Sequence, residues 1–223
     1  MQLDVTAIRA AIFDMDGLML DTEPIYRKAW LRATADMGYQ LADDFYSSFV
    51  GRSNDDCDRL MQATFGEDLP IEKLRERRDF FWRETIREDG VPLRPGLLKL
   101  LDWLEEREIP KAIATASDRA EADISLSATD IMPRFHSITA GNEVANNKPA
   151  PDIYLEAARK LGVAPEYCIA FEDSNAGAIA ATAAGIPTIL VPDLQTPAPE
   201  TLSRVFAVFP SLLDARTMLA AEN

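Results

Sequence analysis

The stretch Ala10–Gly17, which reads AAIFDMDG, decides the fold, because four apolar residues run directly into two aspartates and a glycine. A short continuous apolar run of this kind is typical of a strand that is buried on both faces of a parallel sheet. The pattern recurs, each time ending in polar residues, at Lys111–Ala114 before TAS, Tyr167–Phe171 before EDSN, and Thr188–Val191 before PD. The sequence therefore predicts several buried parallel strands.

Helical patterns lie between these predicted strands. Five leucines between positions 97 and 104 mark one helix, and a second helix spans Tyr154–Leu161 and ends at Gly162. A third, Ala176–Ala184, is rich in small residues and ends at Gly185. This alternation predicts an α/β fold built on a doubly wound parallel sheet.

The segment 21–91 breaks the alternation, because it has helical periodicity and no convincing strand. Apolar residues at helix spacing run from Ile25 to Met37, and a second helix is predicted around Leu74–Trp82. The borders of the segment carry the proline and glycine residues that are typical of linkers. We therefore expect an α/β core formed by residues 1–20 and 92–223, with an all-helical domain, residues 21–91, inserted into it.

Composition excludes several classes of function. The 23 basic and 37 acidic residues give a net charge of −14, which disfavours nucleic acid and anionic membranes as partners. One histidine and two cysteines rule out a His/Cys zinc cluster and a disulfide framework. We expect Cys57 and Cys168 to be thiols and His136 to be structural. Without a signal peptide or a long apolar segment, the chain is expected to be soluble and cytoplasmic.

Polar residues follow the predicted strands at the points where the strands end. Parallel strands present their carboxyl ends at one edge of a sheet, where ligands bind. The residues expected to meet there are Asp14, Asp16, Thr115, Ser117, Glu172 and Asp173, with Lys148 of NNKPAPDIY reaching over from a helix entrance.

Four carboxylates at one edge would repel one another unless a cation lay among them. Oxygen ligands favour a hard ion, and Mg²⁺ fits best because it retains water molecules and binds a substrate phosphate. One carboxylate could attack phosphorus to form an aspartyl-phosphate, while another protonates the leaving alkoxide.

Each residue also has a purely structural interpretation. The Asp-x-Asp-Gly segment could form a turn, and Thr115 could cap a helix that begins near Asp118. Lys148 could be solvated, and Glu172 and Asp173 could favour the N-terminus of the following helix. Their shared position at strand ends favours the functional interpretation.

The segments AIFDMDGLMLDTEP, AIATAS, NKPAPDIYLEAARKLGV and CIAFEDSNAGAIAATAAGI resemble the four motifs of the haloacid dehalogenase superfamily, in the same order and at normal separations. The resemblance is to the branch with a helical cap after the first motif. It implies a Rossmann-like core and a cap domain that closes over the core on hinges and selects the substrate.

The resemblance also implies roles for individual residues. Asp14 matches the nucleophile, and Asp16 matches the general acid/base, whose backbone carbonyl also binds Mg²⁺. Thr115 and the amide of Ala116 match groups that hold the transferred phosphoryl group, and Lys148 matches the lysine that steadies nucleophile and phosphate.

Two acidic residues complete the implied metal site. Glu172 and Asp173 match the acidic pair of the family, with Asp173 as the direct ligand. The metal ligands implied are therefore Asp14, Asp16, Glu172 and Asp173. In the helical insertion, our candidates for substrate specificity are Glu23, Tyr26, Arg52 and Asn54.

Within the superfamily, the sequence favours a Mg²⁺-dependent phosphatase of small phosphomonoesters such as sugar phosphates, acting as a monomer. Asp16 argues against the dehalogenases, which lack an acid there. Hexose-phosphate mutases of the β-phosphoglucomutase kind carry a histidine and an arginine where this chain has Tyr26 and Asn54, although Arg52 is close by. A mutase and a phosphometabolite-binding protein without turnover remain alternatives.

Overall fold

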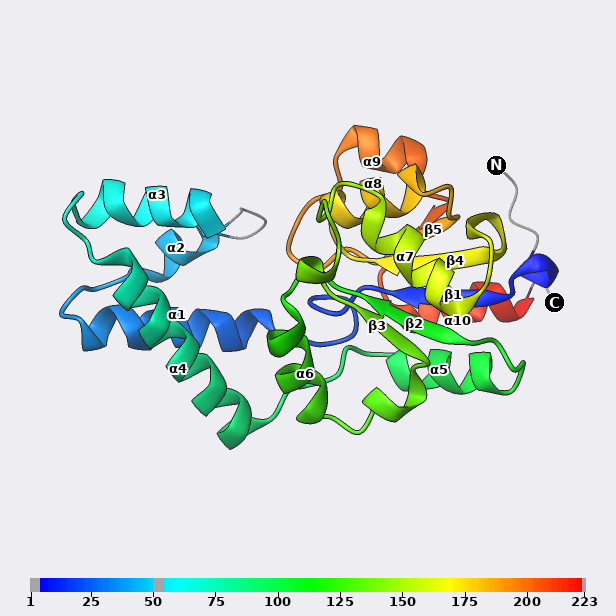
Figure 1. The fold of residues 1–223 in the computed structure, drawn as a ribbon, viewed down its shortest axis with the longest axis horizontal. Helices are drawn as coiled ribbons and strands as arrows, with labels where there is room; N and C mark the ends of the chain where they lie inside the picture. Colours follow the sequence, from blue (N-terminus) through cyan, green and yellow to red (C-terminus); the bar gives the residue numbers. More distant parts are fainter. Residues whose placement is uncertain (1–4, 50–53, 222–223) are drawn as a thin grey trace. The chain divides into compact units, whose positions relative to one another are not determined.

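The computed structural model describes the backbone of residues 5–49 and 54–221, and the side chains of these residues except 43, 44, 47, 54 and 55. Contacts divide the chain into two compact units, Met1–Asp21 with Pro92–Asn223, and Thr22–Val91. The larger unit contains the sheet, and the described elements of the smaller unit are all helices joined by short connections (Figure 1). None of the described helices has the length and apolar character needed to cross a membrane.

The larger unit is built on a six-stranded parallel sheet with the order β3-β2-β1-β4-β5-β6. This arrangement confirms the predicted α/β fold with a doubly wound sheet. The chain winds outward in both directions from β1 and β4, so the strand order reverses between these two strands, which is where such sheets bind ligands. The strands are β1 Ala10–Phe13, β2 Lys111–Ala114, β3 Ser137–Thr139, β4 Cys168–Glu172, β5 Thr188–Leu190 and β6 Ala207–Val208.

Two of these strands, β3 and β6, were not predicted. They are only three and two residues long, lie at the two edges of the sheet, and are partly exposed. β3 has no continuous apolar run, and β6, although it lies in the apolar run 205–209, forms only two residues of strand. By contrast, every residue of β1, β2, β4 and β5 is buried. The last residue of β4 is Glu172, which carries a carboxylate into the buried sheet.

Helices cover both faces of the sheet (Figure 1). Helices α7 and α8 pack against one face, and α5 and α10 pack against each other on the opposite side. The helices are α5 Leu97–Glu105, α6 Arg119–Ser127, α7 Asp152–Leu161, α8 Asn175–Ala183, α9 Pro199–Arg204 and α10 Leu212–Ala221. Short 3-10 turns occur at Val5–Ala7, Met132–Arg134, Gly141–Glu143 and Pro165–Tyr167.

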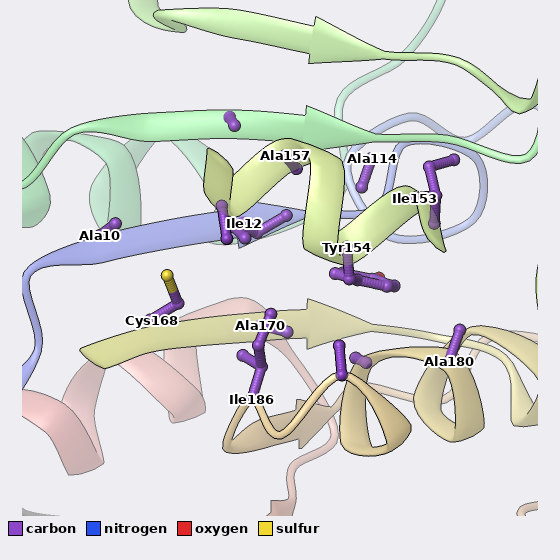
Figure 2. Close-up of a cluster of buried hydrophobic side chains, with 14 residues drawn as sticks. Ala10, Ile12, Ala114, Ile153, Tyr154, Ala157, Cys168, Ala170, Ala180 and Ile186 are labelled. Carbon is purple, nitrogen blue, oxygen red and sulfur yellow. The ribbon is translucent and has the colours of Figure 1, made fainter. Parts of the chain in front are cut away.

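The core beneath α7 is made largely of small residues. Alanines of β1, β2 and β4 face α7 and α8, as Figure 2 shows for Ala10, Ala114 and Ala170. These short side chains allow the helices to approach the sheet closely, and the larger Tyr154 and Ile153 of α7 fill the space at the strand ends. The packing therefore fixes the first turn of α7 against the edge where the site is expected.

The smaller unit consists of α1 Glu23–Asp36, α2 Asp43–Tyr46, a 3-10 turn Ser47–Phe49, α3 Asn54–Phe65 and α4 Ile71–Asp89. Helices α1 and α4 pack along each other, with Trp30 and Trp82 buried. Arg78 of α4 lies over the ring of Trp30 at 5.2 Å, a cation–π contact that joins the two helices.

Candidate active site

The site lies at the carboxyl ends of β1, β2 and β4, where the strand order reverses. Asp14 directly follows β1, Thr115 follows β2, and Glu172 and Asp173 end and follow β4. Asp14, Thr115 and Glu172 are buried, with Glu172 completely excluded from solvent. Charged side chains occupy such positions at low cost only when they have partners.

Lys148 supplies the positive charge at this edge. Its side chain is only 4% exposed, and its ammonium donates a hydrogen bond to Oδ1 of Asp14 and another, at 2.7 Å, to Oε1 of Glu172. Lys148 is therefore not a solvated lysine. Burial alone would lower its pKa, but the Asp14 and Glu172 carboxylates raise the pKa of Lys148 above its usual value, so the ammonium stays charged.

Glu172 is held by donors on both of its carboxylate oxygens. Oε1 accepts from Lys148 and, at 2.7 Å, from the hydroxyl of Tyr154. Oε2 accepts from the backbone N–H of Asp173 at 3.1 Å, and from the N–H and hydroxyl of Ser174 at 3.2 and 3.1 Å. Glu172 thus also stabilises the start of α8, as its structural interpretation expected. Through the hydrogen bond at Oε1, Glu172 also orients the Lys148 ammonium.

Tyr154 was predicted only as part of a helix, and no role at the site was expected for it. Burial, reinforced by the Glu172 carboxylate, raises the pKa of Tyr154 well above its usual value, so the phenol remains a hydrogen-bond donor. Only the proximity of Tyr154 to Lys148 in NKPAPDIY could have signalled this contact.

Three carboxylates at this edge could hold a metal ion. Oxygen atoms of Asp14, Glu172 and Asp173 lie within 4.8 Å of one another. Burial raises the pKa of Asp14 to about 7, although the Lys148 ammonium opposes the rise. Burial and the neighbouring carboxylates also raise the pKa of Asp173 well above its usual value. Such a crowded set of carboxylate oxygens, two of the three residues being buried, fits a hard divalent cation, which would relieve their repulsion.

Gly17 allows the first motif to lie close to the carboxylate of Asp173. Its φ of +83° is a left-handed conformation that favours glycine, and a Cβ there would lie 2.3 Å from Oδ2 of Asp173. The same Cβ would lie 3.3 Å from Oδ2 of Asp193, which follows β5. Asp193 pairs with Arg94 at 2.9 Å, so an ion pair flanks the acidic cluster.

Asp16 faces the end of β2. Its Oδ2 accepts a hydrogen bond from the hydroxyl of Ser117 at 2.8 Å and a longer one from Thr115 at 3.4 Å. Thr115 in turn accepts from the N–H of Ser117 at 3.1 Å. Thr115 does not cap the next helix, because the N-cap of α6 is Asp118. The hydroxyl of Ser117 is a partner of Asp16 that was not assigned a role in advance.

Asn147 joins the Ala116 loop to the loop that carries Lys148. Its side-chain amide donates to the carbonyl of Ala116 at 2.8 Å, and Gly141 donates its N–H to the carbonyl of Ser117 at 2.9 Å. A Cβ at Gly141 would lie 2.3 Å from the Ala116 oxygen, so these loops meet closely only because a glycine is there. The Ala116 backbone is thereby held in place.

The specificity candidates belong to the helical unit. Glu23, at the start of α1, accepts a hydrogen bond from the hydroxyl of Tyr46 at 2.8 Å. The ring of Tyr26 stacks on that of Trp82, with centroids 5.7 Å apart. Arg52 lies outside the described residues, and of Asn54 only the backbone, at the start of α3, is described.

Comparisons with known proteins show the family to which the chain belongs. The family model of the haloacid dehalogenase-like hydrolases matches residues 11–191. The chain belongs to this family. A phosphorylated carbohydrates phosphatase from Thermotoga maritima is 31% identical over 218 residues, which cover 96% of this chain and 91% of that protein. As a member of this family with phosphatases among its relatives, the chain is a phosphoric monoester hydrolase.

Two solved structures share the fold over nearly all of the chain. The structure of CbbY from Rhodobacter sphaeroides in complex with phosphate has a TM-score of 0.77 and 27% identity, and covers 93% of this chain and 96% of that one. A β-phosphoglucomutase from Clostridium difficile has a TM-score of 0.75 and 27% identity, and covers 96% of each chain. Both phosphate-binding and mutase proteins are therefore among the relatives of this family member.

Proposed function

We propose that this hydrolase is a Mg²⁺-dependent phosphatase of small phosphorylated carbohydrates or similar metabolites, and that Asp14 is its nucleophile. The observation that carries the proposal is the buried Lys148 ammonium, which joins Asp14 to Glu172 beside Asp173. The relative from Thermotoga maritima supports the substrate class, since it is named a phosphorylated carbohydrates phosphatase.

Asp14, Asp173 and the backbone carbonyl of Asp16 would hold the Mg²⁺, with Glu172 close by. When bound, the ion would neutralise charge on the phosphoryl oxygens and the carboxylates. Lys148 pairs with one oxygen of Asp14 and so orients the carboxylate for attack on phosphorus. The Asp14–phosphorus bond forms as the ester P–O bond breaks, which leaves a phosphorylated Asp14.

Asp16 would serve as the general acid and then as the general base. In the first step it gives a proton to the leaving alkoxide, and in the second it takes a proton from the water that attacks the phosphorylated Asp14. Ser117 holds the Asp16 carboxylate on its β2 side. The hydroxyl of Thr115 and the N–H of Ala116 would bind the phosphoryl oxygens, on a backbone that Asn147 fixes.

The helical unit, residues 21–91, would act as the cap that selects the substrate, through Glu23, Tyr26, Arg52 and Asn54. Hinge segments near residues 20–24 and 91–96 would allow it to close and exclude water.

Substituting Tyr26 by Ala should then change the ranking of substrates by kcat/KM without removing hydrolysis. An unchanged ranking would count against Tyr26 as a specificity residue.

The experiment is a panel of phosphate esters assayed for phosphate release with and without Mg²⁺, for wild type and Asp14→Asn. We expect release by wild type with Mg²⁺ and a loss of at least roughly a thousandfold in the variant, since the nucleophile is removed. Absence of release from every ester, or full activity of Asp14→Asn, would overturn the assignment.

The second candidate function is a hexose-phosphate mutase, which the likeness to the Clostridium difficile β-phosphoglucomutase favours. A mutase must keep water away from its phosphorylated aspartate until the second hydroxyl attacks. Product analysis with a hexose 1-phosphate separates the two functions. Faster formation of the 6-phosphate than of free phosphate would favour the mutase.

A further inference from the structure

Tyr154 is a buried tyrosine whose hydroxyl reaches the proposed catalytic centre from inside the core. It lies on the first turn of α7, and among the described residues it is the largest side chain that is fully buried. Figure 2 shows it beneath α7, near the carboxyl end of β4. Its ring packs in the apolar cluster, while its hydroxyl donates to Oε1 of Glu172 at 2.7 Å.

The same tyrosine contacts both partners of the buried ion pair. The Lys148 ammonium lies 5.3 Å from the centroid of the Tyr154 ring, and its hydrogen-bond acceptor Glu172 also accepts from the Tyr154 hydroxyl. A cation near an aromatic ring is attracted to it. Ring and hydroxyl together therefore constrain the position of Lys148 relative to Glu172.

Oε1 of Glu172 and Oδ1 of Asp14 compete for one ammonium group. Lys148 donates to both oxygens, so its position depends on the relative strength of the two acceptors. A second donor on Oε1 takes up part of the negative charge of that oxygen and weakens its pull on Lys148. If the Tyr154 hydroxyl were lost, Lys148 would move toward Glu172 and away from Asp14.

We propose that Tyr154 is a positioning residue for phosphoryl transfer, whose hydroxyl, through Glu172, keeps Lys148 shared with the nucleophile Asp14. This inference rests on the proposed phosphatase function. Packing alone requires only the ring, which phenylalanine would also supply. The hydroxyl is the part that reaches the ion pair.

The test is Tyr154→Phe, which removes one oxygen atom and keeps the ring. We expect kcat to fall about tenfold, while KM for the ester stays within about twofold, because the ion pair orients the nucleophile more than it binds the leaving group. Inhibition by orthovanadate, a mimic of the transferring phosphoryl group, should weaken by a similar factor. Thr188→Val is the matched control.

Thr188 is the first residue of β5, away from the ion pair. The control removes its buried hydroxyl, which donates to the carbonyl of Ile186 at 2.9 Å. It should lower the unfolding temperature and leave kcat unchanged. If Tyr154→Phe also lowered only the unfolding temperature, with kcat and vanadate inhibition as in wild type, the positioning role would be overturned.

A double-mutant cycle tests the route through Glu172. In a Glu172→Gln background, the residual kcat should fall less than about threefold on adding Tyr154→Phe, because the charge that the hydroxyl moderates is gone. An undiminished tenfold effect would contradict the route. Wild type that releases no phosphate would instead refute the proposed phosphatase function, and this inference with it.

Discussion

At the scale of single residues, hydroxyl groups hold two carboxylates of the site, because Ser117 donates to Asp16 and Tyr154 donates to Glu172. Asp14, Glu172 and Asp173 could be predicted because each stands directly at the end of a buried apolar run. The bonds from Ser117 to Asp16 and from Tyr154 to Glu172 could not be predicted, since they depend on distances between segments far apart in the chain. Tyr154 also matches the apolar pattern of its helix, which concealed its polar contact.

The hydroxyl of Ser117 should help to hold the proposed general acid. We expect Ser117→Ala to lower kcat about five- to tenfold, because the Asp16 carboxylate loses its 2.8 Å donor and keeps only the longer bond from Thr115. Steady-state kinetics measures this effect. Ser203→Ala, which removes a hydroxyl bond on α9, should behave as wild type. Equal activity of the two variants would refute a role for Ser117.

At the scale of elements, buried strands were predicted well because burial on both faces leaves a continuous apolar run. The edge strands β3 and β6 were missed because they are short and partly exposed. The helix α3 was not predicted individually, although Leu60, Met61 and Phe65 stand at helical spacing. For the strands, the deciding factor is how much of the element the core covers.

Helix α8 packs closely against Glu172 because residue 177 is a glycine. A Cβ at Gly177 would lie 1.7 Å from Oε1 of Glu172. Glycine to alanine inside a helix normally stabilises by about 1 kcal/mol. Here we expect Gly177→Ala to destabilise by roughly 2 kcal/mol and to lower kcat, because Glu172 must move. Urea unfolding and kinetics measure both effects.

Gly162→Ala is the control for this substitution. Gly162 has a φ of +69° and no atom within 4 Å of its would-be Cβ, so the variant should lose about 1 kcal/mol from backbone strain alone, with kcat unchanged. If Gly177→Ala stabilised the protein, that result would contradict the close contact between residue 177 and Glu172.

Glu105, the last residue of α5, should make the free energy of unfolding depend on pH. Hydrogen bonds from Arg134, followed by those from Lys111, lower the pKa of Glu105 from 4.5 to about 2. A lowered folded-state pKa stabilises the protein above the unfolded-state value, and this stabilisation is lost as pH falls toward the folded-state value. The unfolding free-energy difference between wild type and Glu105→Gln should therefore shrink between pH 5 and pH 3. A constant difference would contradict this.

At the scale of the whole molecule, the net charge of −14 describes the surface and not the site. At the site, a buried lysine and a proposed divalent cation face a group of carboxylates. The charge balance therefore disfavours nucleic acid as a partner without disfavouring an anionic substrate. The sign of the electrostatic potential at the site would depend on the ion bound there.

Metal binding should stabilise the whole folded chain. We expect Mg²⁺ to raise the unfolding temperature of wild type after EDTA treatment, by an amount that grows with its concentration, since the ion binds only the folded site. Asp173→Asn should lose this response, while Asp214→Asn, at an exposed position of α10, should retain it. An equal response in both variants would place the metal elsewhere.

The most direct test of the central claim is to trap the reaction with a phosphate ester by rapid acid quench and map the modified peptide by mass spectrometry. Our account predicts a phosphoryl group on Asp14 in wild type, and none in Asp14→Asn. A phosphoryl group on another residue, or its persistence in the Asp14→Asn variant, would contradict the account.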